Sequence, residues 1–98
     1  MRKNLSDRTL KALRPAVAGR RYDVRDAQVP GLLVCVTDKG VRTFMLQARY
    51  PGSTQPTRRA LGVYAVELSL EQAREKARLW RKMLKAGVDP RLSIGAQS

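Results

Sequence analysis

The side chains of this sequence that could do chemistry are mostly cations. Between residues 39 and 66 the chain carries five Lys or Arg side chains and no Asp or Glu. Arginine and lysine bind phosphates, and on an exposed surface arginine can also read guanine edges while glutamine reads adenine. The alternative is a solvated face whose arginines serve only solubility. The candidate nucleic-acid contacts are Lys39, Arg42, Thr43, Gln47, Arg49, Arg58 and Arg59.

Catalysis and metal binding lack the residues they need. The chain has no His and a single Cys, Cys35, which excludes His-based metal sites, Ser-His or Cys-His nucleophiles and an internal disulfide. No set of acid and base catalysts accompanies the three tyrosines, and Asp23, Asp26 and Asp38 lack the spacing of a Ca²⁺ loop. The sequence therefore predicts no catalytic residue, no metal site and no cofactor.

The net charge of +12 over 98 residues points to a polyanionic partner, because self-repulsion on this scale destabilises a small domain. The apolar content of 43 % is enough for one folded domain. The longest apolar run, residues 32–36, is too short to cross a bilayer, and the basic N-terminus lacks the apolar stretch of a signal peptide. We therefore expect a small intracellular protein with no membrane partner.

Three strands are expected to position the candidate contacts. Residues 32–37 are β-rich, and residues 37–40 have the composition of a tight hairpin turn. Alternating residues 41–50 and the returning segment 57–63 complete a three-stranded antiparallel meander. Residues 22–26 are interpreted as a short extended piece outside this sheet.

A helix is expected at each end of the chain. Ser6 can cap a short helix over residues 7–14. Near the other end, Ser69 and Gln72 have capping-box spacing, and the helix that follows ends before Gly87. One apolar stripe of this second helix can cover the sheet, and its members are Leu70, Ala73, Ala77, Trp80 and Leu84.

The alternation along residues 41–50 assigns a face to each side chain. Phe44 and Leu46 share the face that the C-terminal helix covers, whereas Gln47 and Arg49 share the opposite face, which is expected to be open and positive. Cys35 also points outward by parity and is expected to be inert. A second row of cations follows the helix, and a solvated flank is the favoured interpretation over phosphate contact for Arg74, Arg78, Arg81 and Lys85.

The order of these signals resembles a known family. Together the motifs are similar to the N-terminal arm-type DNA-binding domain of phage and genomic-island tyrosine recombinases, or integrases. The resemblance runs from Leu5 to Pro90 and rests on Leu5-Ser6-Asp7, Leu13-Arg14-Pro15, Asp26, Val29-Pro30-Gly31-Leu32, Val34, Val36-Thr37, Arg42-Thr43-Phe44, Leu61-Gly62-Val63-Tyr64, Leu68-Ser69-Leu70-Glu71-Gln72-Ala73-Arg74 and Ala86-Gly87-Val88-Asp89-Pro90.

The resemblance implies an α+β fold whose three-stranded sheet, backed by the C-terminal helix, enters the DNA major groove at arm-type sites. It implies a domain over residues 1–90, with 91–98 as a tail or the start of a linker to absent core-binding and catalytic domains. The fragment itself is then no enzyme. It is expected in the bacterial cytoplasm, at the nucleoid. Arg59 departs from the pattern at a position that is usually apolar, which requires a bulge or an exposed edge.

Two other functions stay open at this point. The chain could be a regulatory module that binds other integrase subunits or a directionality factor. It could also be a basic RNA-binding domain, although an RNA-reading sheet usually exposes aromatic side chains and those of this sequence fall on apolar positions.

Overall fold

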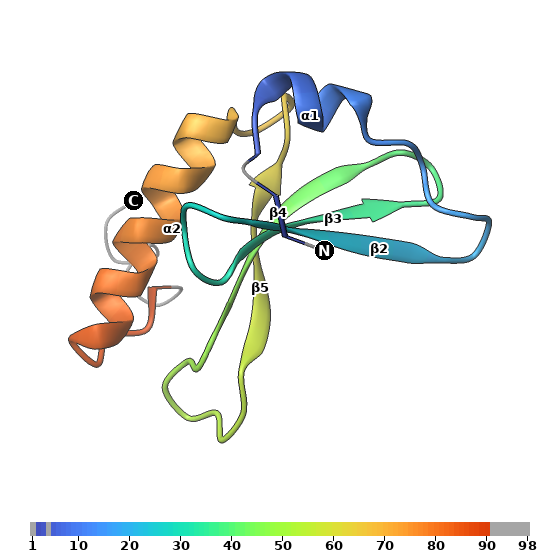
Figure 1. The fold of residues 1–98 in the computed structure, drawn as a ribbon. Coiled ribbons are helices and arrows are strands. Elements are labelled where there is room, and N and C mark those ends of the chain that lie inside the picture. The colour runs from blue at the N-terminus through green and yellow to red at the C-terminus, as the bar shows by residue number, and fades with distance from the viewer. Residues whose placement is uncertain (1, 4, 91–98) are drawn as a thin grey trace.

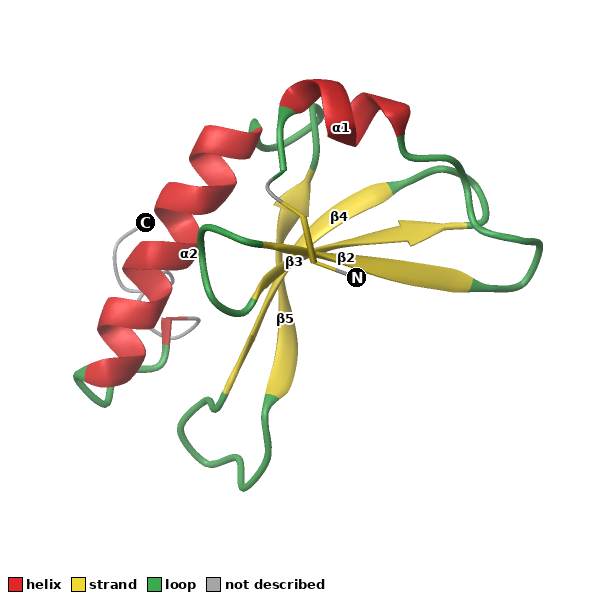
Figure 2. Ribbon diagram, in the orientation of Figure 1, coloured by secondary structure: helices red, strands yellow, loops and turns green. Residues whose placement is uncertain are grey.

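The computed structural model describes residues 2, 3 and 5–90 and has an α+β fold (Figure 1). Its elements, in chain order, are β1 (Arg2–Lys3), α1 (Asp7–Ala12), β2 (Arg21–Asp26), β3 (Leu32–Thr37), β4 (Arg42–Ala48), β5 (Thr57–Val63) and α2 (Leu70–Lys85). The strands form one sheet in the order β1-β2-β3-β4-β5. Figure 2 shows α2 beside the sheet and α1 across one of its ends. The tail expected over residues 91–98 lies outside the described residues.

The sheet has more strands than the sequence predicted. The segment expected to be a separate extended piece is β2, which pairs antiparallel with β3 and sets Tyr22 opposite Val36 and Val24 opposite Val34. The two-residue β1 then pairs in parallel with β2. Charged residues alternate with Tyr22 and Val24 along β2, so the strand contains no continuous hydrophobic run that would indicate it in the sequence. The predicted strand number is therefore wrong, whereas the α+β class, the β3–β4–β5 meander and the C-terminal helix are confirmed.

A β-bulge interrupts the pairing of β4 with β5. Phe44 lies opposite Gly62 and Met45 lies opposite Ala60, so Leu61 is an extra residue on β5. Gly62 has φ of +156°, a conformation that glycine adopts more easily than other residues. The extra residue is buried, so the bulge turns Leu61 into the core rather than out to solvent.

Helix α1 starts where the sequence predicted and ends two residues early. The Ser6 side chain accepts a hydrogen bond from the Thr9 N–H at 3.1 Å, and the flanking Leu5 and Leu10 are both buried. Leu13 is already extended, with ψ of 126°. The proline two residues further on disfavours helix in the residue before it, which is consistent with the early end.

Helix α2 covers the inner face of the sheet, the face that also carries Val34, Phe44 and Leu46. Its capping box is complete, with Gln72 N–H donating to Ser69 Oγ at 3.2 Å and Ser69 N–H donating to Gln72 Oε1 at 2.9 Å. The predicted apolar stripe is buried apart from its half-buried last residue. No helix of the described part of the chain is long and apolar enough to cross a membrane.

The indole of Trp80 anchors α2 on this inner face. Trp80 is 4 % exposed and meets the Tyr50 ring edge to face, with 6.4 Å between ring centroids. The Tyr50 hydroxyl in turn donates to the Leu46 carbonyl at 2.9 Å. The core position expected for Trp80 is confirmed.

A buried ion pair joins α2 to β2 and to the N-terminal segment. Arg74 is 6 % exposed and binds both carboxylate oxygens of Asp26, from Nε at 3.1 Å and from Nη2 at 3.0 Å. Arg74 Nη2 also donates to the Leu5 carbonyl at 2.7 Å, and the N–H groups of Leu5 and Val29 donate to Asp26. The solvated position expected for Arg74 is therefore wrong, because this turn of α2 faces the end of β2.

Burial by itself would raise the pKa of Asp26, because it disfavours the charged carboxylate. The hydrogen bonds and the positive charge of Arg74, together with the N–H of Leu5, outweigh this effect and lower the pKa below its ordinary value. Asp26 is therefore ionised wherever the fold is intact near neutral pH.

Replacing Trp80 with Ala should destabilise the fold by about 3–5 kcal/mol, as large-to-small core substitutions do. Small domains have only about 5–15 kcal/mol of stability, so the melting temperature should fall steeply. Thermal unfolding followed by circular dichroism measures this. Leu79→Ala is the matched control, because Leu79 lies on the same helix and is 55 % exposed. Equal melting temperatures for the Trp80 variant and the wild type would contradict the anchoring role.

The stability of the fold should decrease as the pH is lowered below about 4, the ordinary range of an aspartate pKa. Because folding lowers the pKa of Asp26, its contribution is complete above the unfolded pKa and is lost as the pH falls through the folded pKa. At neutral pH, Asp26→Asn should destabilise the fold by about 3–5 kcal/mol, since it leaves Arg74 buried without its counter-charge. Urea unfolding at a series of pH values measures both effects.

Asp23→Asn is the control for that series, because Asp23 also lies on β2 and also pairs with an arginine, but in a partly solvated position. Its loss should change the free energy of unfolding by no more than about 1 kcal/mol. A similar loss in both variants would contradict the special role of the buried pair.

Candidate nucleic-acid interface

The outer face of the sheet, opposite the face that α2 covers, is the candidate interface. Cross-strand pairing fixes its members, because directly paired residues point to the same side. Strand β2 contributes three charged residues, β4 two polar residues and β5 one cation. We define the outer face by these six side chains: Arg21, Asp23, Arg25, Thr43, Gln47 and Arg58.

Two side-chain contacts cross the outer face above β3. Arg25 Nη2 donates a hydrogen bond to Gln47 Oε1 at 2.6 Å, which joins β2 to β4. Arg58 forms an ion pair with Asp23, which joins β5 to β2. The second pair is partly solvated, with side chains 42 % and 26 % exposed, so it contributes no more than about 1 kcal/mol to stability. These contacts hold four of the six polar side chains in defined positions.

The middle of the outer face is closed rather than open. Leu33 and Cys35 point to this side, as parity predicted, but they are 0 % and 3 % exposed. Burial raises the pKa of the Cys35 thiol, and the negative charge of Asp23 raises it further. The thiol is therefore protonated at neutral pH, and the side chains around it form the accessible surface of this face.

The Pro30-Gly31 turn determines where Gln47 sits. The N–H of Gln47 donates to the Gly31 carbonyl at 2.8 Å. Gly31 has φ of +85°, and a Cβ at this position would lie 2.6 Å from the Gln47 carbonyl oxygen. Only glycine therefore allows the two backbones to approach so closely, and this approach fixes the strand position from which the Gln47 side chain meets Arg25.

The predicted contact residues do not all lie on the outer face. Thr43, Gln47 and Arg58 do, and Lys39 is exposed in the turn between β3 and β4. Arg49 follows the end of β4 and lines a hollow beside α2, so the expectation that it shares a strand face with Gln47 is wrong.

Two of the predicted contacts belong to the inner side of the sheet. Arg42 donates from Nη2 to the Leu13 carbonyl at 2.9 Å and thereby ties β4 to the end of α1. Arg59 lies opposite Leu46 with its guanidinium 5.2 Å from the centroid of the Tyr50 ring. The bulge that could have turned Arg59 outward affects Leu61 instead, so the side chain stays on the side of α2.

Sequence reasoning missed Arg21 and Arg25 as members of the candidate interface. The available signal was the alternation of residues 21–26, in which charged side chains at odd positions flank Tyr22 and Val24. This alternation predicts a strand with one charged face. It was obscured because Asp26, on the apolar side, is also charged.

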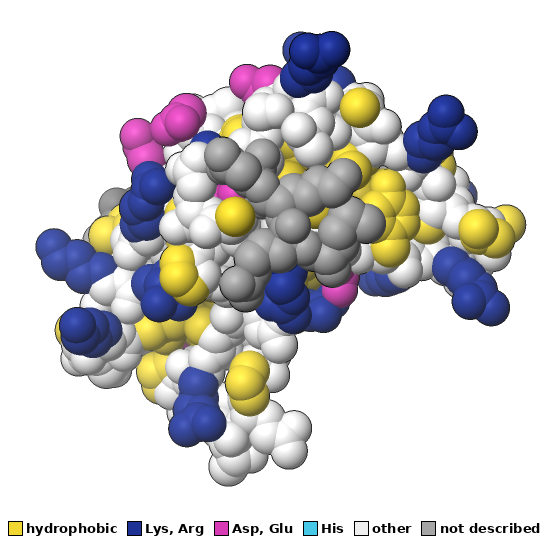
Figure 3. All heavy atoms as spheres, in the orientation of Figure 1, with side chains coloured by type: hydrophobic (Ala, Val, Ile, Leu, Met, Phe, Trp, Pro, Cys, Tyr) yellow, Lys and Arg dark blue, Asp and Glu magenta, His cyan; other side chains and the backbone are white. Residues whose placement is uncertain are grey.

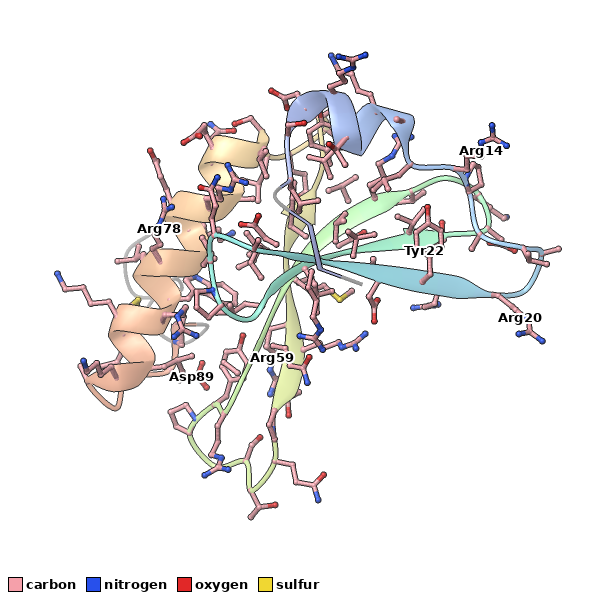
Figure 4. The ribbon with its side chains drawn as sticks, in the orientation of Figure 1. Arg14, Arg20, Tyr22, Arg59, Arg78 and Asp89 are labelled. Carbon is pink, nitrogen blue, oxygen red and sulfur yellow. The ribbon has the colours of Figure 1, made fainter. Side chains whose placement is uncertain are left out.

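A group of exposed cations extends the outer face at one end. Arg20, Arg21 and Lys39 line a hollow at the turn between β3 and β4, where Asp38 accepts a hydrogen bond from the Gly19 N–H at 2.9 Å. Figure 4 shows Arg14, Arg20 and Tyr22 at this end of the sheet, far from α2, and Arg78 on the outward side of α2. Most of the acidic surface in view lies instead over α1 and the start of α2 (Figure 3).

The arrangement of donors on the outer face can bind a polyanion. Among the residues that the structure describes, no three Asp, Glu or Cys side chains are grouped closely enough to hold a metal ion. The outer face offers guanidinium and amide donors on a twisted sheet, and guanidinium groups pair well with phosphates and with guanine edges.

The sequence was compared with models of known protein families. The family model described as an arm DNA-binding domain matches residues 5–97, which is nearly the whole chain. No curated protein matches the sequence.

Proposed function

We propose that this chain, which belongs to the arm DNA-binding domain family, binds double-stranded DNA with the outer face of its sheet. Domains of this family occur in integrases and are not catalytic. The observation that carries the proposal is the set of donors on the outer face, three arginines and Gln47 against the single acid Asp23, continued by exposed Lys39 at one end. A two- or three-stranded sheet fits the major groove of B-DNA, where these donors can reach base edges.

The contacts within the outer face suggest a role for each residue. Arg21 and Lys39 are exposed at the end of the sheet and would contact phosphates. Gln47 and Arg25 lie nearer the middle and would contact base edges. The Gln47 oxygen already accepts a hydrogen bond from Arg25, and its second lone pair and the Nε2 donors remain for a two-bond contact with adenine. Arg58 would leave its ion pair with Asp23 where it contacts DNA.

In the wider proposal, the DNA sites are arm-type sites, and binding supports integration and recombination by a tyrosine recombinase of a prophage or genomic island. Other integrase subunits and a directionality factor are the protein partners that this role implies. The site of action would be the nucleoid in the bacterial cytoplasm. Residues 1–90 would form the DNA-binding domain, followed by a linker.

The described residues favour duplex DNA over single-stranded RNA. Sheets that read RNA stack bases on exposed aromatic side chains. Here Phe44, Tyr50, Tyr64 and Trp80 are buried, and half-buried Tyr22 lies on the inner face with its hydroxyl bonded to the Arg14 carbonyl. No aromatic ring of the described strands lies on the outer face, so base stacking finds no platform there.

Binding to duplex DNA should weaken steeply as salt is added. If about five or six cations neutralise phosphates, the logarithm of the binding constant should fall with the logarithm of salt concentration with a slope near −5, from about −0.9 per contact. Fluorescence anisotropy of a labelled duplex at several salt concentrations measures the slope. A flat response would exclude nucleic acid as the partner.

Gln47→Ala and Arg25→Ala should selectively lower affinity for a specific duplex, enriched from a random library with the wild-type chain. Each should lose about 1–3 kcal/mol on that duplex and much less on a scrambled one, because base contacts specify sequence. Lys39→Ala should weaken both duplexes alike and make the salt slope shallower by about one unit.

Arg78→Ala is the control for these variants, since it removes an exposed arginine from the outward side of α2. It should leave the discrimination between the two duplexes unchanged. Equal losses on the specific and scrambled duplexes for Gln47→Ala and Arg25→Ala would show that the outer face does not read sequence.

A further inference from the structure

A groove separates the loop after β4 from the last turns of α2. Two adjoining hollows form it, and Arg49 and Leu84 line both of them. Arg81 and Lys85 line the first hollow on the α2 side, and Ser53 lines the second hollow on the loop side. We call this feature the loop–helix groove. It lies on the side of the sheet that α2 covers, so it is separate from the outer face.

The loop–helix groove concentrates positive charge. Arg49, Arg81 and Lys85 are all exposed, and among the described residues no acidic side chain lines either hollow. Asp89 follows α2 in the chain but is not part of the lining. Half-buried Arg59 adds a further cation, because its guanidinium packs against the ring of Tyr50, which lines the second hollow. Like charges gathered in this way repel one another, and an anion in the groove would relieve that repulsion.

One of the three cations is held in place before any ligand binds. Arg81 Nη1 donates to the Pro30 carbonyl at 3.0 Å, which fixes the guanidinium relative to the turn before β3. A guanidinium has five N–H donors, so one such bond leaves others for a ligand. A donor that is already oriented loses less conformational entropy on binding than a free side chain.

We propose that the loop–helix groove binds phosphate groups of the DNA backbone, as a second contact that does not depend on base sequence. This inference rests on the proposed function, because it takes duplex DNA as the partner. It adds that the chain contacts DNA with two surfaces, the outer face of the sheet and the loop–helix groove. Exposed cations around a small apolar floor suit phosphates better than base edges, since the apolar residues Ala48 and Leu84 offer no donor or acceptor side chain.

The test compares two double variants that remove the same charge from exposed positions. The first double variant, Arg49→Ala with Lys85→Ala, removes two of the cations that line the groove. Arg78→Ala with Lys82→Ala removes two exposed cations of α2 that do not line the groove. Anisotropy titrations of a scrambled duplex at several salt concentrations give the slope for each 98-residue chain. The groove pair should make the slope shallower by about two units, and the control pair by less than half of that.

Equal slope changes in the two double variants, or no change in the groove pair, would contradict phosphate binding in the loop–helix groove. If thermal unfolding shows that the groove pair no longer folds, Lys85→Gln alone replaces it and should reduce the slope by about one unit against Lys82→Gln. The outcomes also separate the two proposals. A flat wild-type slope contradicts DNA binding itself, whereas a steep wild-type slope that both double variants share contradicts only the groove.

Discussion

Asp26 and Arg74 are 48 positions apart in the sequence, and their buried contact fixes how the helix, the sheet and the N-terminal segment meet. Neither side chain could occupy its place without the other, because an unpaired charge in such a position is strongly unfavourable. The pair specifies geometry more than it adds stability, since the loss of hydration offsets much of its attraction. It also orients β2: with Asp26 turned toward α2, the alternation of the strand turns Arg25 to the outer face.

That orientation links the core to the candidate interface. Arg25 meets Gln47, and Asp23 meets Arg58, above the buried side chains of β3. Where DNA takes a donor that one of these contacts already uses, the existing contact opens as the new one forms. The free energy gained there is the difference between the contacts with DNA that form and the contacts within the outer face that open. Such a difference favours discrimination between sequences over high affinity. A phosphate contact made elsewhere on the chain would then supply affinity that this face does not.

The sequence predicted the elements whose signals are local. The capping box of α2, its apolar stripe and the alternation of β4 depend on residues a few positions apart, and all three occur in the structure. The position of Arg74 could not be predicted in this way, because nothing within its own helix distinguishes it from Arg78, which is exposed. Only the distant Asp26 makes the difference. The same holds for Arg49, whose surroundings depend on where β4 ends and α2 passes.

The candidate site was therefore only partly predictable. Gln47 and Arg58 follow from strand alternation, whereas Arg21 and Arg25 required recognition of β2, a strand whose charged residues outnumber its apolar ones. Arg42 and Arg59 show the opposite error. Each is a cation on a strand, yet one supports α1 through the Leu13 carbonyl and the other packs on an aromatic ring. Residue type alone does not separate a ligand contact from a structural one.

The bulge in β5 has a consequence for how copies of this chain meet one another. Strand β5 is the last strand of the described sheet. Its free edge therefore carries backbone donors and acceptors that no neighbouring strand pairs with. Such edges readily pair with the same edge of another molecule and start aggregation. Here the extra residue Leu61 breaks the regular spacing, and Arg58 and Arg59 place adjacent positive charges along the strand. At the opposite edge, β1 covers β2. The sheet that we propose to bind a polyanion is thus protected against pairing with the sheet of a second copy.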